Sequence, residues 1–136
     1  MTFYKSRTFG STVKVPVIAV VDDDESVRSA VQRLVRAAGM KAVQYASGEE
    51  LIDTFRKGGA QGVDCIVLDL HMLGMNGFQV AESLMRSGIQ IPLVFMSGAD
   101  EDGVRALGCP ADLQWIRKPF DDAVLLPAIE ACIFPS

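Results

Sequence analysis

The chain has 136 residues, of which 49% are hydrophobic and 22% are charged, and its formal net charge at pH 7 is -4. This length suits one compact domain, and this composition is typical of a globular protein and excludes a disordered chain. The acidic balance disfavours direct binding to nucleic acid or to an anionic membrane surface, and no apolar run reaches the roughly 18 to 20 residues that a membrane-spanning helix needs.

The first third of the chain predicts an arm, a strand and a helix. Residues 1–14 are polar and aperiodic and have no apolar segment of a secretory signal, so we expect a flexible arm before one domain over residues 15–134. Val15–Val21 is a short β-branched apolar run, which indicates a strand buried on both faces. Apolar residues then recur at helical spacing over residues 27–38, and Gly39 stands where a helix cap belongs.

The middle of the chain continues this alternation. Ala42–Tyr45 predicts a weaker strand, and Ser47 with Glu50 forms a capping-box sequence that opens a second helix. Cys65–Leu68 predicts a central strand, and a glycine-punctuated loop separates it from a third helical pattern over residues 78–85.

The last third is less regular. Pro92–Met96 predicts a fourth strand, but residues 100–112 contain two glycines and a proline, so we expect a short or distorted fourth helix. Leu113–Ile116 predicts the fifth strand. Asp121 can cap a final helix, in which Pro127 is tolerable only near the first turn.

Five strands alternating with five helices predict an α/β fold with a doubly wound parallel sheet covered on both faces. A closed barrel would need about eight such units. In an open sheet of order 2-1-3-4-5, ligands bind beyond the carboxyl ends of the strands, where the strand order reverses. The polar residues that follow the predicted strands at that edge are Asp22, Asp23, Asp24, Asp69, Ser97 and Lys118.

Several carboxylates, a hydroxyl and an ammonium at one edge predict a site for a divalent cation and a phosphoryl group. Taken singly, these residues also have structural interpretations. The acidic run 22–24 could be a solvated helix cap, Ser97 a turn former and Lys118 a surface lysine. Asp69 directly ends a buried strand, where an unpaired carboxylate is costly, which favours a functional role.

Cysteine usage predicts a reducing compartment. The three cysteines, Cys65, Cys109 and Cys132, are an odd number and lack the short spacing of metal ligands. We expect reduced thiols that behave as small hydrophobic side chains, and hence a cytoplasmic protein.

Five motifs occur in the order known from one family. They are Val20–Asp24, Val67–Met72, Met75–Gly77, Met96–Gly98 and Lys118–Phe120. They resemble the motifs of receiver domains of two-component response regulators, and the likeness runs over about residues 15–133. The resemblance implies a flavodoxin-like, CheY-like three-layer fold. It also implies a phosphorelay switch that gains and loses a phosphoryl group on itself, and not an enzyme acting on an external substrate.

The resemblance assigns roles at the predicted site. Asp69 would be the phosphoacceptor, and Lys118 would pair first with Asp69 and then with a phosphoryl oxygen. Asp22 would act on the metal mainly through a bound water. The implied Mg²⁺ ligands are Asp22, Asp23, Asp69 and the backbone carbonyl of His71.

The resemblance also implies a switch mechanism and partners. Ser97 would donate its hydroxyl to the phosphoryl group and, coupled to the ring of Trp115, would change the surface of the fourth helix, fifth strand and fifth helix. His71 would influence how water reaches the site, and the Lys118–Pro119 peptide bond would be cis. The phosphoryl donor would be a sensor histidine kinase or a phosphotransfer protein. The signal would pass to an output protein or output domain, with a phosphorylation-dependent homodimer as a further expectation.

Two alternatives from other classes stay open. A haloacid-dehalogenase-like phosphatase with an aspartate nucleophile needs a second Asp two residues after the first, where this chain has His71. A phosphorylation-independent interaction module would normally have lost Asp69 or Lys118, and both are present. The chain departs from the family pattern at Leu73, where Pro is usual, and at Gly74, where an acidic residue is frequent.

Overall fold

A five-stranded parallel sheet forms the centre of the computed structural model, which describes residues 7–9, 12–59 and 62–134. Its strands are β3 (Val17–Val21), β4 (Lys41–Tyr45), β5 (Cys65–Asp69), β6 (Leu93–Ser97) and β7 (Ile116–Arg117). They pair in the order β4-β3-β5-β6-β7, with every pair parallel. The predicted doubly wound sheet of order 2-1-3-4-5 is therefore confirmed.

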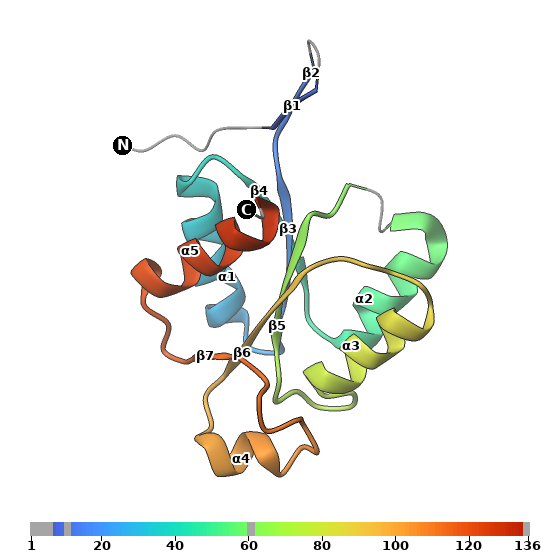
Figure 1. Cartoon of the computed structure of the whole chain (residues 1–136), viewed down its shortest axis with the longest axis vertical. Helices are drawn as coiled ribbons and strands as arrows, with labels where there is room; N and C mark the ends of the chain where they lie inside the picture. Colours follow the sequence, from blue (N-terminus) through green and yellow to red (C-terminus); the bar gives the residue numbers. More distant parts are fainter. Residues whose placement is uncertain (1–6, 10–11, 60–61, 135–136) are drawn as a thin grey trace.

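Helices cover both faces of this sheet. They are α1 (Glu25–Ala37), α2 (Gly48–Thr54), α3 (Gly77–Arg86), α4 (Glu101–Arg105) and α5 (Asp122–Ile133), and a π-helical turn, η1 (Phe55–Gly59), follows α2 directly. Helices α1 and α5 lie on one face and α2 and α3 on the other, whereas the short α4 lies beyond the end of the sheet (Figure 1). In the described part of the chain, no helix is long and apolar enough to cross a membrane.

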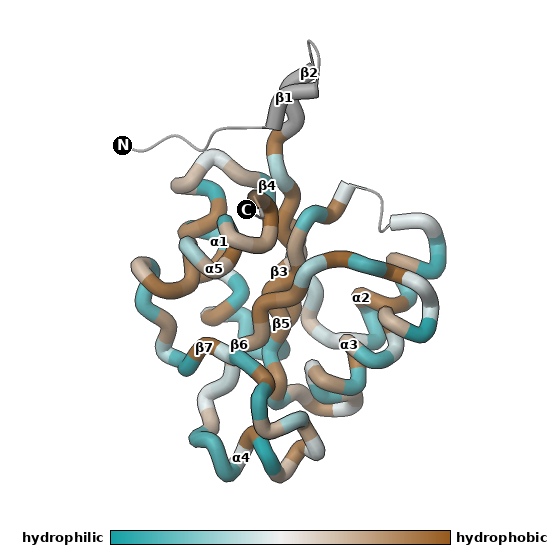
Figure 2. Tube along the Cα trace, in the orientation of Figure 1, coloured by the Kyte–Doolittle hydropathy of each residue, from teal (hydrophilic) through white to brown (hydrophobic). Residues whose placement is uncertain are grey.

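The buried strands separate two apolar cores. Successive side chains of a strand point to opposite faces, so β3 sends Ile18 and Val20 towards α1 and α5, and Ala19 and Val21 towards α2 and α3. Every residue of β5 is buried. This is why these strands appear as continuous apolar runs, visible as brown segments at the centre of Figure 2.

Each α-helix begins after a polar side chain that accepts a hydrogen bond from a backbone amide of the first turn. These capping residues are Asp24, Ser47, Asn76, Asp100 and Asp121. The capping box predicted from Ser47 and Glu50 forms only in part, because the Glu50 carboxylate accepts from the amide of Ala46. A complete capping box stands at α3, between Asn76 and Gln79.

The prediction for the fifth strand was wrong in its bounds. Strand β7 comprises Ile116–Arg117 and not Leu113–Ile116, and it pairs with Met96 and Ser97 of β6. Leu113 and Trp115 are half-buried and line a hollow beside α4. Their apolar character thus serves packing ahead of the strand instead of strand pairing.

The prediction for Pro127 was also wrong. Pro127 is not in the first turn but inside α5, which continues to Ile133. A proline removes one helical hydrogen bond and disfavours a helix interior. Leu125, Ile129 and Ile133 are buried in the core on both sides of the proline, and this burial stabilises the helix through it.

Part of the predicted N-terminal arm has regular structure. Strands β1 (Arg7–Phe9) and β2 (Thr12–Lys14) pair as an antiparallel hairpin. The hairpin extends beyond the start of β3 (Figure 1). The other arm residues, 1–6 and 10–11, lie outside the described residues.

Candidate functional site

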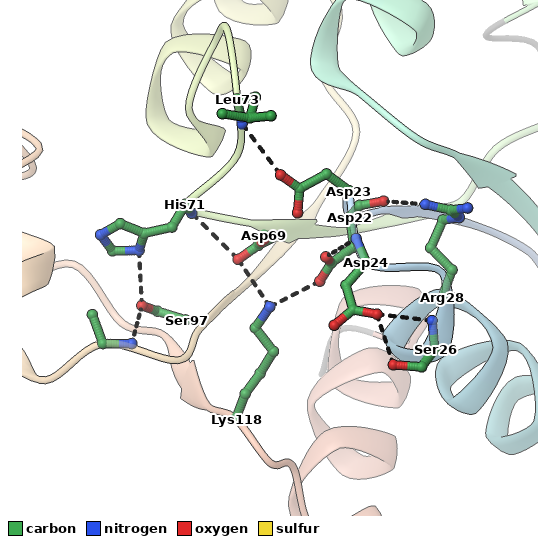
Figure 3. A network of polar contacts seen from close by, with 11 residues as sticks. Asp22, Asp23, Asp24, Ser26, Arg28, Asp69, His71, Leu73, Ser97 and Lys118 are labelled. Atoms are coloured by element: carbon green, nitrogen blue, oxygen red, sulfur yellow. Dashed lines mark hydrogen bonds and ion pairs between the residues drawn. The ribbon is translucent and has the colours of Figure 1, made fainter.

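The predicted polar side chains come together at the carboxyl ends of the strands (Figure 3). Asp22 follows β3, Asp69 ends β5, Ser97 ends β6 and Lys118 follows β7. Asp22, Asp69 and Ser97 have exposed fractions of 0%, 1% and 0%. Buried polar groups need partners, so their contacts decide what this site can do.

Lys118 is shared between two buried carboxylates. Its Nζ lies 3.0 Å from Oδ2 of Asp22 and 3.2 Å from Oδ1 of Asp69. The side chain of Lys118 is itself only 18% exposed, so these contacts are poorly screened by water. Sequence reasoning anticipated the contact with Asp69 but not the one with Asp22.

The single positive charge of Lys118 only partly balances the negative charges of Asp22 and Asp69. Burial raises the pKa of Asp69 to about 6, the charge of Asp22 adds to the rise, and the charge of Lys118 opposes it. Burial alone would lower the pKa of Lys118, but the contacts with Asp22 and Asp69 raise it above its ordinary value. The ammonium therefore stays charged, while the pocket holds an excess of negative charge.

Three carboxylates fit the requirements of a hard divalent cation. Asp22, Asp23 and Asp69 each offer an oxygen atom, and these oxygens all lie within 4.8 Å of one another. The donor set is made of carboxylate oxygens, with no thiolate or imidazole nitrogen, which matches the preference of Mg²⁺ or Ca²⁺. Asp23 is exposed, and its Oδ2 accepts a hydrogen bond of 3.2 Å from the amide of Leu73.

Asp24, the third residue of the acidic run, caps α1. Oδ1 of Asp24 accepts hydrogen bonds from the amide and the hydroxyl of Ser26, at 2.9 and 2.6 Å. These bonds lower the pKa of Asp24 and hold it at the start of α1. The interpretation of this run as a helix cap is therefore correct for Asp24, whereas Asp22 and Asp23 face the site.

Sequence reasoning missed Arg28, which supports the site from α1. Its guanidinium donates a hydrogen bond of 2.7 Å to the backbone carbonyl of Asp22 and another of 3.3 Å to Oε1 of Gln44. It thereby fixes the backbone that carries Asp22. An arginine in the first turns of an amphipathic helix is common, so the sequence carried no signal for this role.

His71 connects Ser97 to α4. Its Nδ1 lies 3.1 Å from Oγ of Ser97, and its Nε2 lies 3.2 Å from the carbonyl oxygen of Gly103. The amide of His71 donates to Oδ1 of Asp69 at 3.3 Å. Oγ of Ser97 also accepts from the amide of Ala99 at 3.0 Å. The resemblance had implied that His71 influences how water reaches the site, but the sequence had not indicated this bridge.

Two further predicted features lie next to this network. The Lys118–Pro119 peptide bond is cis, as expected from the resemblance. Trp115 is half-buried and lines hollows beside α4 and α5, apart from the polar contacts described above. Its coupling to Ser97 stays a prediction.

Comparison with known sequences identifies relatives of this fold and site. The family model of the response regulator receiver domain matches residues 18–130. Response regulator protein TmoT of Ectopseudomonas mendocina is 33% identical over 119 residues, covering 86% of this chain and 52% of that protein. Transcriptional regulatory protein FixJ of Azorhizobium caulinodans is 29% identical over 118 residues, covering 85% and 54%. The chain thus spans about half the length of these curated relatives.

Solved structures agree with the sequence comparison. A response regulator receiver protein from Burkholderia phymatum has a TM-score of 0.72 and 36% identity, and the match covers 87% of this chain and 94% of that chain. The crystal structure of FixJ-N has a TM-score of 0.75 at 24% identity, covers 89% of this chain and 95% of that one, and supports the fold alone. Because the family model covers most of the chain, this protein belongs to the response regulator receiver domains of two-component signalling.

Proposed function

We propose that this receiver domain is a phosphorylation switch in which Asp69 accepts a phosphoryl group from a sensor histidine kinase or a phosphotransfer protein. The observation that carries the proposal is the shared ammonium of Lys118. It sits 3.0 and 3.2 Å from two buried carboxylates, at a site whose third carboxylate, Asp23, is exposed. A purely structural ion pair would not need this excess of negative charge.

The transfer is a nucleophilic substitution at phosphorus. A carboxylate oxygen of Asp69 forms a bond to phosphorus, the bond from phosphorus to the donor nitrogen breaks, and its electron pair leaves with the donor imidazole. Lys118 then balances the charge on a phosphoryl oxygen, and Ser97 donates its hydroxyl to another. Attack of water on the phosphorus later releases inorganic phosphate and restores the carboxylate, so the reaction begins and ends on the protein itself.

The carboxylates of Asp22, Asp23 and Asp69, with the backbone carbonyl of His71 implied by the family resemblance, would hold Mg²⁺. When bound, the cation offsets the negative charge that otherwise repels the phosphoryl donor. Asp22 already has Lys118 as a partner, which supports a contact with the metal through water. Asp23 is the exposed member and the natural point of entry.

The signal would pass to a partner through the surface formed by α4, β7 and α5. Ser97 ends β6, pairs with β7 and contacts His71, so a movement of its hydroxyl reaches this surface directly. The curated relatives are about twice as long as this chain, which supports an output protein or output domain as the recipient. A phosphorylation-dependent homodimer is a further proposed form of the signal. The free thiols of Cys65, Cys109 and Cys132 support a cytoplasmic location.

Phosphorylation by a small donor tests the proposal. Incubation with acetyl phosphate and Mg²⁺, followed by intact-mass analysis, should add one phosphoryl group to the wild type and none to Asp69→Asn. Asp53→Asn is the matched control, because Asp53 is an exposed residue of α2 paired with Lys57. A chain that is never modified, or an Asp69→Asn variant that is modified as fully as the wild type, would refute the proposal.

A further inference from the structure

The hydroxyl of Ser97 already has hydrogen-bond partners in the resting protein. A serine hydroxyl has one proton to donate, and Ser97 is fully buried with two partners, Nδ1 of His71 and the amide of Ala99. The amide can only donate, so the bond from Ala99 uses a lone pair of the Ser97 oxygen. The single proton is therefore left for the contact with His71.

The second contact of His71 determines the direction of the first. A carbonyl oxygen can only accept, so Nε2 must carry the proton in the contact with Gly103. In the neutral imidazole, Nδ1 is then the acceptor, and Ser97 donates to it. His71 thus draws the Ser97 proton in a direction that excludes donation to a phosphoryl oxygen at the same time.

The carbonyl of Gly103 belongs to a short helix that depends on outside partners. Helix α4 has five residues, and the carbonyls of a last helical turn lack intrahelical donors. The amide of Leu107 donates to the carbonyl of Val104, and Nε2 of His71 contacts the carbonyl of Gly103. Helices this short are marginal without external contacts, so the imidazole contributes directly to the order of α4.

We propose that His71 is a positioning residue that latches the Ser97 hydroxyl in the resting state and ties its release to the last turn of α4. This inference rests on the proposed function for the phosphoryl group, but the contact itself is a property of the resting protein. When Ser97 donates to a phosphoryl oxygen, its bond with Nδ1 breaks. The imidazole then loses one of its two anchors, and the support of Gly103 weakens.

The tautomer of His71 tests the latch without any phosphoryl ligand. Long-range ¹H–¹⁵N NMR of the resting protein near neutral pH should show the proton on Nε2 and none on Nδ1, with a signal from a single histidine because the chain has only one. A proton on Nδ1, in either a neutral or a charged ring, would overturn the proposal, because Ser97 would then accept and its proton would be free.

Affinity for beryllofluoride, a mimic of a bound phosphoryl group, tests the function of the latch. In the presence of Mg²⁺, His71→Phe keeps a ring but removes both nitrogens, and it should bind beryllofluoride about three- to tenfold more tightly, the range expected for one neutral hydrogen bond. His71→Gln keeps a donor and an acceptor on a side chain of similar reach and should bind like the wild type. With Ser97→Ala as background, His71→Phe should change the affinity by less than about twofold.

The outcomes separate the two proposals. If the wild type binds no beryllofluoride and gains no phosphoryl group, the proposed function fails, while the tautomer still decides the resting contact. If the wild type binds but His71→Phe has unchanged affinity, the latch is wrong and the function stands. The latch is also wrong if His71→Phe changes the affinity equally with and without the Ser97 hydroxyl. Backbone NMR shifts of residues 101–107 should change in His71→Phe if the hydrogen bond from Nε2 to the carbonyl of Gly103 supports α4, and they should stay unchanged if it does not.

Discussion

Asp69 is buried, and its partners are a shared cation, Lys118, and the backbone amide of His71, which together set its acid–base behaviour. The carboxylate is 1% exposed, and Lys118 divides its charge between Asp69 and Asp22. The pKa of Asp69 is accordingly raised to about 6. An ionised nucleophile is thus available near neutral pH, at a cost to the stability of the fold.

The contribution of Asp69 to the stability of the metal-free protein should become less favourable as the pH rises from about 4 to about 6. Because the pKa of Asp69 is higher in the folded than in the unfolded state, the folded chain binds the extra proton in this range, and the contribution of this group decreases with pH. Asp69→Asn removes the buried charge and should be more stable than the wild type by about 1 to 3 kcal/mol at pH 7.5, with the difference vanishing near pH 4.

Urea unfolding at these two pH values, with a chelator present, measures the effect. Asp53→Asn serves as the control, because it removes a carboxylate that is exposed instead of buried. A lower stability of Asp69→Asn at pH 7.5 would show that Lys118 more than offsets the burial of the charge.

Some features of the site could be predicted from the sequence, and others could not. Asp69 and Lys118 were predictable, because a charged residue at the end of a buried strand needs a partner at the same sheet edge. The bridge from His71 to Gly103 was not predictable. It depends on where α4 ends in space, and the glycine and proline pattern of residues 100–112 does not determine that.

Helix α3 begins directly against the strand that carries Asp69. A Cβ on Gly77 would overlap the carbonyl oxygen of Asp69 and would lie 3.0 Å from the Cα of Leu70. Both neighbours are backbone atoms of a buried segment, so neither can move away cheaply. The position requires glycine for close approach, not for its backbone angles.

Gly77→Ala should therefore destabilise the protein by about 1 to 3 kcal/mol, although alanine is the better helix former. It should also slow phosphorylation, because the displaced backbone carries the nucleophile. The matched control is Gly98→Ala, since a Cβ there would meet nothing within 4 Å, and its stability should stay within about 0.5 kcal/mol of the wild type. Chemical denaturation of the wild type and the two variants measures these differences in stability. Equal unfolding midpoints for Gly77→Ala and Gly98→Ala would contradict the steric argument.

At the element scale, buried strands and capped helices were the predictable parts. β3 and β5 are buried on both faces and so carry continuous apolar runs. The errors lie at the periphery. An apolar run such as Leu113–Ile116 shows that side chains are buried, but not whether the backbone pairs with a neighbour. Pro127 lies inside α5 because tertiary packing outweighs local preference, which no local rule can detect.

The whole molecule should gain stability from a divalent cation, because a site that forms only on folding binds only the folded state. Mg²⁺ at ten times its dissociation constant should raise the free energy of unfolding by about 1.4 kcal/mol. The gain should be larger at pH 7.5 than at pH 5, where protonation of Asp69 competes with the metal.

Urea unfolding with and without MgCl₂, at matched ionic strength, measures this gain. Asp23→Asn should abolish most of it, because Asp23 is one of the three carboxylates of the site. Asp102→Asn, an exposed change on α4, should leave it intact. An equal response of all three proteins would point to nonspecific ion effects instead of a site.

The topology of the whole molecule was predictable because the four short crossovers between its five parallel strands leave few arrangements of the sheet. The N-terminal hairpin was not, since β1 and β2 have three residues each and carry no strong strand pattern. The site lies at the reversal of strand order between β3 and β5, which is where ligands bind in sheets of this topology.

The shortness of β7 has a consequence for local unfolding. This edge strand has two residues and one neighbouring strand, and Lys118 follows it directly, held by a hydrogen bond of 2.8 Å from its amide to the carbonyl of Ser97. Edges with so few backbone bonds open far more often than a buried centre, so amide hydrogens should exchange quickly here and slowly in β5. Each such opening withdraws the ammonium from both carboxylates at once, and the lifetime of the assembled site is therefore set by the fraying of one edge, independently of the stability of the core.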